Sequence, residues 1–373
     1  MTDEQFKEIF KEIGGKLDAL NENLSKAHTE EFEWAKAILG QQQSFEKRLG
    51  LDTTPRDFVP YYPPTSLSSI YPEVFNKYGE RMEFFFISSR EGAYSPNSKN
   101  SRYIIWDKYN YGNDTHFYTQ NEIFRTVGNP KRRFAILAEA GTSRPELYKN
   151  ILKYKKHIEK HFDLLFTYNP QILNNLSNAR FIPLAADVWY GTGRTRFEID
   201  KDFHFTILPE NYKHKTKNIS MISSHLENLP MHIVRKKLAF YCKEKGLADT
   251  YGKFDGGSEF QMELPFEKYR YSIVVENGIE PYYFSEKIMN AFAAQTIPIY
   301  LGATEIGEFF NTKGIIQIEL EDCNHIENIL KRCTVEEYER RLPAVIDNFN
   351  RSMKYAAQTR YDDLYSMYIK DKG

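Results

Sequence analysis

Cysteine is scarce in this chain, and what there is excludes two common uses of the residue. Among 373 residues there are three cysteines, Cys242, Cys323 and Cys333. Their number is odd and their spacing is not that of metal ligands, so neither a disulfide framework nor a zinc site is indicated. A reduced, cytoplasmic compartment fits them best.

An excess of one charge sign and long apolar runs are also lacking. Lys and Arg total 50 against 51 for Asp and Glu, so the net charge of −1 gives no overall field that would attract nucleic acid. No apolar run approaches the ~20 residues of a membrane span. The first thirty residues carry charges throughout, which argues against a signal peptide. We therefore expect a soluble protein that binds no nucleic acid and has no transmembrane segment.

Aromatic residues, by contrast, are abundant. They make up 15% of the chain, with 26 Tyr and 27 Phe. Such side chains can stack on sugars and bases, although most of them are expected in hydrophobic cores. A chain of this length is too long for one small core, so we expect two domains.

Residues 1–50 are predicted to form a helical extension. Apolar residues alternate spacings of four and three there, with an interruption at Gly14-Gly15: Phe6, Phe10, Ile13, Leu17, Leu20, Leu24 and Ala27. The pattern fits an amphipathic helix packed on its own domain, and it also fits a coiled coil that would join copies of the chain through residues 6–27. Neither interpretation bears on catalysis.

Strand and helix signals alternate between Met82 and Phe205, which predicts a parallel sheet in a first Rossmann-like domain. A helix is expected over 145–161. The strands are expected at 84–88, 103–106, 134–138, 163–168 and 181–184.

The stretch from Tyr269 to Gly302 predicts a strand–helix–strand unit of a second such domain. An apolar run over 271–275 ends at Glu276-Asn277-Gly278, and a second short strand covers 297–301. Between them Ser285 is a suitable N-cap, and Lys287 adds a positive charge in the first helical turn. A helix N-terminus at the carboxyl end of a parallel strand favours phosphate, although any α/β protein contains such units.

The residues of this stretch resemble the signature of the α1,3-fucosyltransferases, glycosyltransferase family ten. That family reads roughly F-E-N, Y-x-[ST]-E-K, a helix and then [TA]-[IV]-P-[IV]-x-x-G. Here the corresponding strings are Glu276-Asn277, Tyr283 with Ser285-Glu286-Lys287, and 297–302. Val275 stands where the family usually has Phe, which should affect packing rather than chemistry. The resemblance extends over about 220–318, is fainter over 102–183 and is absent from residues 1–80.

The resemblance implies an α/β fold of the GT-B architecture, in which two Rossmann-like domains face a cleft. It also implies an inverting enzyme that transfers L-fucose from GDP-fucose to a hydroxyl of an acceptor glycan. No acidic D-x-D site is evident, so no cofactor or divalent metal is expected to be required. Animal members of the family are anchored in the Golgi, and the lack of an anchor here points to a bacterial-type or viral soluble enzyme.

Donor-binding residues are carried over from the same resemblance. Ser223, Arg235 and Tyr251-Gly252 follow the order of the family's second domain, whose arginine contacts the donor diphosphate. Arg235 lies beside Lys236 and Lys237, so a surface charge is the alternative. The full set implied to bind the donor is Arg235, Lys287, Glu286, Asn277, Glu276, Tyr283, Ser285, Ser223 and Tyr251.

Glu139 is the candidate catalytic base. It follows the expected strand over 134–138, at a position where the family has a glutamate, although Ala140 departs from the usual follower. An exposed turn glutamate is the alternative, and Asp107 is the reserve candidate. A carboxylate here would deprotonate the incoming hydroxyl.

The predicted division of the chain is a helical extension (1–50), an acceptor domain (51–205), a donor domain (206–345) and a C-terminal helix (346–373). Two other functions remain open. One is the same fold with a different nucleotide-sugar donor, and the other is a non-catalytic nucleotide- or sugar-binding module. The acceptor itself is not readable, although the first domain and its segment 90–101 are expected to shape the acceptor site.

Overall fold

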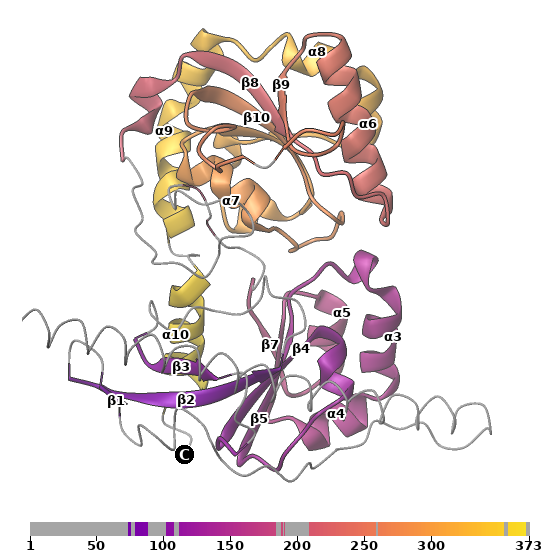
Figure 1. The fold of residues 1–373 in the computed structure, drawn as a ribbon, viewed down its shortest axis with the longest axis vertical. Helices are drawn as coiled ribbons and strands as arrows, with labels where there is room; N and C mark the ends of the chain where they lie inside the picture. The colour runs from indigo at the N-terminus through magenta and orange to yellow at the C-terminus, as the bar shows by residue number, and fades with distance from the viewer. Residues whose placement is uncertain are drawn as a thin grey trace, which may run out of the picture.

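The computed structural model describes residues 74–75, 79–88, 102–107, 112–183, 188, 190, 209–258, 260–353 and 357–370. Two α/β domains follow one another along the chain, each built on its own mainly parallel sheet (Figure 1). The predicted extension over 1–50, the possible coiled coil over 6–27, the segment 90–101 and the domain boundaries at 50/51 and 205/206 lie outside the described residues.

The first sheet has the spatial order β3-β2-β4-β5-β6-β7, with all of these strands parallel and β1 antiparallel to β2. Chain order reverses between β2 and β4, as in doubly wound folds. The strands are β1 (Val74–Phe75), β2 (Arg81–Ser88), β3 (Ile104–Asp107), β4 (Thr115–Thr119), β5 (Arg132–Leu137), β6 (Leu164–Thr167) and β7 (Ala179–Phe181).

Helices cover both faces of the first sheet. Side chains of α3 (Pro145–Lys153), α4 (Lys155–His161) and α5 (Pro170–Asn175) pack on one face. The other face is covered by α10 (Ala357–Tyr368), through Tyr361, Leu364 and Tyr365. The short 3₁₀ helices of this domain are η3 (Gln120–Phe124) and η4 (Gly141–Ser143).

The second sheet is parallel throughout and has the order β12-β11-β10-β8-β9, so chain order reverses between β8 and β10. Its strands are β8 (Lys217–Ile222), β9 (Asp249–Tyr251), β10 (Tyr269–Val275), β11 (Ile297–Leu301) and β12 (Ile316–Gln317). Around it lie α6 (Pro230–Glu244), α7 (Glu286–Ala293), α8 (Ile326–Leu330), α9 (Val335–Ser352), η5 (Asn211–His214), η6 (Ile306–Glu308), η7 (Thr312–Gly314) and η8 (Glu321–His325).

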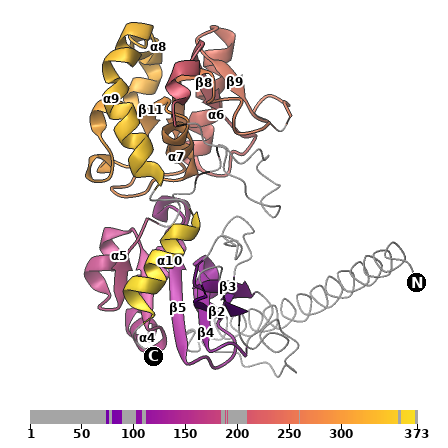
Figure 2. The same cartoon turned by 90° about the vertical axis from the view of Figure 1, so that its left-hand side faces the viewer.

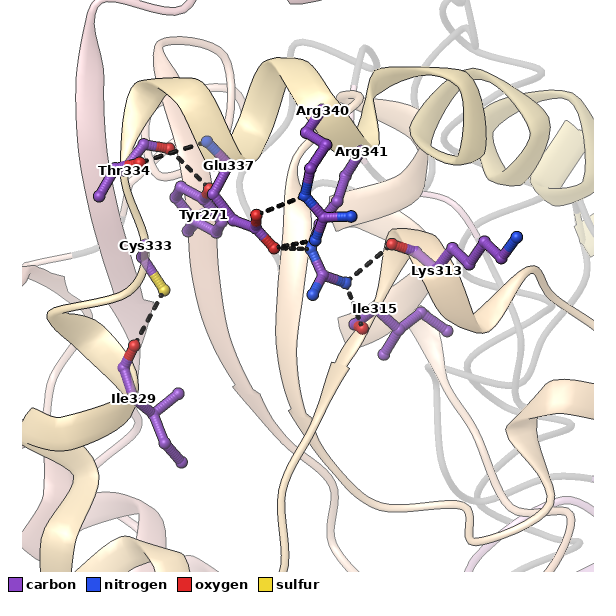
Figure 3. Close-up of polar contacts among 9 residues, drawn as sticks. All are labelled: Tyr271, Lys313, Ile315, Ile329, Cys333, Thr334, Glu337, Arg340 and Arg341. Carbon is purple, nitrogen blue, oxygen red and sulfur yellow. Dashed lines mark hydrogen bonds and ion pairs between the residues drawn. The ribbon is translucent and has the colours of Figure 1, made fainter.

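Helix α9 is fastened to the second sheet at its N-terminus (Figure 3). Thr334 is the N-cap, since its hydroxyl accepts a hydrogen bond from the Glu337 N–H at 3.2 Å, and its carbonyl accepts one from the Tyr271 hydroxyl at 2.8 Å. Arg341 bonds the Glu337 carboxylate at 2.6 Å and the carbonyl of Lys313 at 2.8 Å. These contacts assign α9 to the second domain.

The C-terminal part departs from the predicted division. The boundary between residues 345 and 346 is wrong, because α9 runs through it from Val335 to Ser352. A separate helix, α10, then lies against the first sheet, as Figures 1 and 2 both show. The end of the chain therefore returns from the second domain to the first.

Most predicted elements are present with shifted ends. The helix expected over 145–161 is two helices, because Tyr154 leaves helical geometry between α3 and α4. The strand expected at 181–184 ends at Phe181. Strand β4 was not predicted, because its Thr-His-Phe-Tyr-Thr sequence lacks a long aliphatic run. In the structure it is fully buried between β2 and β5.

The predicted fold class is confirmed for the described residues: an α/β protein with two Rossmann-like domains facing a cavity, in the GT-B arrangement. All three cysteines are unpaired thiols, and burial raises the pKa of both Cys242 and Cys333 to about 12. Within the described part of the chain, no helix combines the length and the apolar character that crossing a membrane requires.

Candidate active site

A cavity of about 830 Å³ opens at the carboxyl edge of the second sheet. Its walls include Ser223 after β8 and Asn277 after β10, the two strands between which chain order reverses. In open α/β sheets this switch point is where ligands bind, because the loops after neighbouring strands diverge there. Almost all described residues that line the cavity belong to the second domain, and Glu139, Ser143 and Arg144 line it from the first.

Two cationic side chains reach this cavity from two helices. Arg235 comes from α6 and is buried, and its guanidinium donates to the Asn277 Oδ1 at 2.6 Å. Lys287 comes from the first turn of α7, and its Nζ lies 2.9 Å from the Glu286 Oε1 and 3.0 Å from the Ser285 Oγ. All of these except Ser285 line the cavity. A guanidinium, an ammonium and a helix N-terminus together form an environment for an anion.

Helix α7 begins where it does because Ser285 caps it. The Ser285 hydroxyl accepts from the Lys287 N–H at 3.4 Å and donates to the Glu276 Oε2 at 2.5 Å, while the Ser285 N–H donates to the Glu276 Oε1 at 3.0 Å. The Glu276 carboxylate also lies 3.7 Å from the Lys287 Nζ. Glu276 therefore fastens the end of β10 to the start of the helix that carries the lysine.

Glu276 itself is completely buried and does not line the cavity. Burial raises the pKa of its carboxyl group, and the nearby Lys287 charge acts in the opposite direction. The structure thus places this predicted donor ligand one layer behind the cavity wall, where it orients Ser285 and Lys287.

Tyr283 and Tyr251 are also placed away from the cavity. Tyr283 is buried at the junction of the domains with its ring 5.3 Å from that of Tyr168, and burial raises the pKa of its phenol well above the usual value. The Tyr251 hydroxyl is 2.7 Å from the Tyr269 hydroxyl. Of the nine residues predicted to bind the donor, the structure brings together five at the cavity: Arg235, Lys287, Glu286, Asn277 and Ser223.

The residue after Tyr251 does line the cavity. Gly252 has φ +101°, and a Cβ there would lie 2.2 Å from the carbonyl oxygen of Ser223. The backbone segments that follow β8 and β9 therefore pass so close to each other that only glycine fits at position 252. This approach is joined by the hydrogen bond from the Ser223 N–H to the Tyr251 carbonyl at 3.0 Å.

Glu139 lines the opposite side of the cavity, just beyond β5. Its main chain is held on both sides. The Gln120 amide, oriented to satisfy its neighbours, accepts from the Glu139 N–H at 2.8 Å. The Glu139 carbonyl accepts a hydrogen bond from the Tyr148 hydroxyl at 2.7 Å, and the Tyr168 hydroxyl oxygen lies 3.0 Å from it. The backbone of Glu139, the candidate base, is therefore held in place by hydrogen bonds.

Asp107, the reserve candidate, ends β3 at the far side of the first sheet. Strands β2 and β4 lie between β3 and β5. In register, Asp107 pairs with Phe86, Phe86 with His116, and His116 with Arg133 near the start of β5. Three inter-strand steps of ~4.8 Å therefore separate Asp107 from Arg133 by about 14 Å, and β5 continues away from that level to Leu137. This separation favours Glu139 over Asp107 as the carboxylate at the cavity.

Several polar cavity residues were not predicted. Asn290 is the most informative, because it follows Lys287 by one helical turn and is the one polar residue in the apolar part of α7, which is a readable signal. His225, Asn228, His232 and Lys253 also line the cavity, with the Nδ1 of His232 2.8 Å from the Asn228 Oδ1. Arg144 gave no local sequence signal.

The described residues contain no cluster of three or more His, Cys, Asp or Glu side chains that could hold a metal ion. The charged side chains that line the cavity are instead Arg235, Lys253, Glu286 and Lys287 from the second domain and Glu139 and Arg144 from the first. This arrangement suits an anionic ligand.

No protein-family model matches the chain, and no curated protein matches it. Solved structures similar to it include an α1,3-fucosyltransferase with GDP-fucose, at 16% identity and a TM-score of 0.42, covering 70% of this chain and 81% of that one. Anabaena Alr3699/HepE with UDP and glucose has 8% identity and a TM-score of 0.49, with coverages of 78% and 100%. The crystal structure of TarM has 10% sequence identity and a TM-score of 0.41, and the match covers 67% of this chain and 54% of that one.

Proposed function

We propose that this chain is an inverting glycosyltransferase that transfers L-fucose from GDP-fucose to a hydroxyl of an acceptor glycan. The observation that carries the proposal is the cavity at the switch point of the second sheet, which gathers Arg235 and Lys287 opposite Glu139. The fucosyl donor rests on the match of Glu276-Asn277, Tyr283 and Ser285-Glu286-Lys287 to the motif of glycosyltransferase family ten.

The diphosphate of the donor is assigned to the cationic side of the cavity. Arg235 can grip phosphate oxygens with two N–H groups, and Asn277 already holds its guanidinium in place. Lys287, in the first turn of α7, lines the same cavity. These groups stabilise the negative charge that develops on the departing GDP. They are proposed to do so without a required divalent metal.

Glu139 is assigned the role of general base. The acceptor hydroxyl oxygen forms a bond to the anomeric carbon while the bond from that carbon to the phosphate oxygen breaks. The electron pair leaves with GDP, and the hydroxyl proton passes to the Glu139 carboxylate. Attack from the first domain on a donor held by the second occurs on the face opposite the phosphate, so the anomeric configuration is inverted. General-base help of this kind is typically worth ~10²–10⁴-fold.

The remaining predicted donor residues receive divided roles. Glu286 is at the cavity and is assigned to sugar hydroxyls, which a carboxylate accepts. Glu276 and Ser285 are assigned to holding Lys287, since both are buried behind it. Tyr283 is assigned to the domain junction, where it packs on Tyr168.

The test is a panel of nucleotide sugars incubated with an acceptor glycan array, with released nucleotide and labelled glycan both measured. Transfer from GDP-fucose supports the proposal. Transfer only from another nucleotide sugar supports the same mechanism with a different donor. Nucleotide binding by calorimetry without any turnover supports a non-catalytic binding module and contradicts the enzyme assignment.

A further inference from the structure

Glu280 joins the two domains beside the cavity without lining it. It lies in the turn after β10, between Asn277 and Tyr283, and it is buried at 8% exposure. Its carboxylate turns to the first domain. There the Oε1 accepts hydrogen bonds from the Thr142 N–H at 2.8 Å and the Thr142 hydroxyl at 2.9 Å, and the Oε2 accepts one from the Tyr168 hydroxyl at 2.9 Å.

These three donors belong to the structure that carries Glu139. Thr142 lies three residues beyond it, and the Tyr168 hydroxyl, besides its contact with Glu280, is 3.0 Å from the Glu139 carbonyl. The same hydroxyl accepts from the Gly141 N–H at 2.8 Å. One carboxylate of the second domain therefore holds the loop of residues 139–143 through both its backbone and its supporting tyrosine.

The backbones approach closely at the same place. A Cβ on Gly278 would lie 2.2 Å from the Thr142 Oγ1 and 2.9 Å from the Ala140 Cβ. Gly278 directly follows Asn277, the residue that holds Arg235. The turn 277–280 thus contacts the phosphate side of the cavity at its first residue and the loop of Glu139 at its last.

We propose that Glu280 is a positioning residue that sets the distance between the Glu139 carboxylate and the donor held by Arg235 and Lys287. The inference rests on the proposed function. The two reacting partners are held by different domains, so their separation depends on the contacts between those domains. A misplacement of about 1 Å can cost on the order of 10²-fold in rate. Three hydrogen bonds to one buried carboxylate oppose such a shift more strongly than neutral pairs would.

The test compares Glu280→Ala and Glu280→Gln with the control Glu305→Gln, which removes an exposed carboxylate from the loop after β11. Glu280→Ala is expected to lower kcat about 10- to 100-fold and to leave the Kd for GDP within about threefold, because no donor-binding side chain is altered. Glu280→Gln retains one acceptor oxygen, so a smaller loss is expected. The control should match the unaltered protein.

A second measurement does not depend on turnover. Amide hydrogen exchange of the peptide that contains residues 140–144 should quicken in Glu280→Ala and stay unchanged in Glu305→Gln, because the Thr142 N–H loses its acceptor. Unchanged exchange would overturn the inference whether or not the protein transfers fucose. Quickened exchange with an unaltered kcat in an active enzyme would also overturn it, since the contact would then serve stability alone.

Tyr168→Phe completes a double-mutant cycle. It removes the hydroxyl that links Glu280 to the Glu139 carbonyl and the Gly141 N–H. If both residues act through one loop, the double variant should lose about as much kcat as the more damaged single variant. A double variant whose kcat falls by the product of the two single losses would contradict action through one loop. Failure of the unaltered protein to bind GDP would instead refute the proposed function, and the exchange experiment would still judge the contact.

Discussion

The two domains share a strand order, yet their strand ends are equipped differently. Leaving aside the antiparallel β1, in both sheets the first parallel strand along the chain lies between the second and the third, as β3-β2-β4 and β9-β8-β10. The second sheet presents a cavity with Arg235 and Lys287 at that point, whereas the first domain contributes Glu139, Ser143 and Arg144 from the segment beyond β5. One fold thus serves two tasks, and the difference lies in the residues at the strand ends.

The hydrogen bonds that hold the cationic residues and those that hold the Glu139 loop also come from different parts of the molecule. The cationic side is held from within its own domain, by Glu276, Ser285 and Asn277. The Glu139 loop is held by Gln120 and Tyr168 of its own domain and by Glu280 of the other. We therefore expect the second domain to decide affinity for the nucleotide, and the relation between the domains to decide rate.

The sharpest test of this division is Glu139→Gln. The amide cannot take up the hydroxyl proton, so turnover should fall by about 10²–10⁴-fold. The Kd for GDP should stay within about threefold, because the donor contacts lie in the other domain. Steady-state kinetics and calorimetry measure the two quantities. Near-normal turnover would mean that another residue is the base.

Replacement of either cation tests the other half of the comparison. Arg235→Ala and Lys287→Ala should each weaken GDP binding by about 1.5–3 kcal/mol, the range for lost hydrogen bonds to charged groups. Lys237→Ala is a matched control, since Lys237 is exposed on α6 two residues from Arg235. GDP titrations that are unchanged in both variants would remove these residues from the phosphate site.

Gly252→Ala tests whether the close approach of the Gly252 and Ser223 backbones is needed for stability and for GDP binding. The new Cβ would meet the Ser223 carbonyl oxygen at 2.2 Å and force a residue with φ +101° to change. We expect a loss of stability above the ~1–2 kcal/mol that a left-handed alanine alone costs, together with weaker GDP binding. Gly256→Ala is the control, because its φ is +87° and its Cβ would meet nothing within 4 Å. Chemical denaturation compares the two, and equal losses would mean that the contact with Ser223 is irrelevant.

The smallest expected effect concerns the anchor of α9 on the second domain. Hydrogen bonds from Arg340 and Arg341 lower the pKa of Glu337 from 4.5 to about 2. A carboxyl group whose pKa falls on folding contributes stability above pH 4.5 and loses it as the pH falls toward 2. Because this ion pair is part-exposed, the contribution should stay below about 1 kcal/mol.

Glu337→Gln should therefore be slightly less stable at neutral pH and should lose less stability than the unaltered protein between pH 4.5 and 2. Denaturation midpoints at several pH values measure this difference. Glu339→Gln, an exposed neighbour on the same helix, should follow the unaltered protein. Parallel pH profiles for Glu337→Gln and the unaltered protein would contradict the assigned pKa.

The strand–helix–strand unit around α7 was well predicted, because its signals are local. Ser285 is the N-cap and β10 and β11 lie where the apolar runs place them. Strand β4 was not predicted because a strand buried on both faces need not be aliphatic when its polar side chains find partners. The Thr115 hydroxyl, for example, accepts a hydrogen bond at 2.9 Å from the Nε of Arg132, which lies 17 residues later on β5. Nothing local marks such a pairing.

The site shows the same limit. A motif placed Glu276 and Tyr283 near the donor, but the fold turned one toward the helix cap and the other into the domain junction. Glu280 gave no signal at all, since its partners Thr142 and Tyr168 lie 138 and 112 residues away in the chain.

The amino-acid sequence by itself determined the α/β alternation and the start of α7, because hydrophobic period and capping act between near neighbours. Tertiary structure alone decided which polar groups of that unit reach the cavity, which are buried behind it and which reach across to the other domain. The physical reason is that a buried polar side chain must find its partner wherever folding brings one, and such partners are set by packing rather than by spacing along the chain.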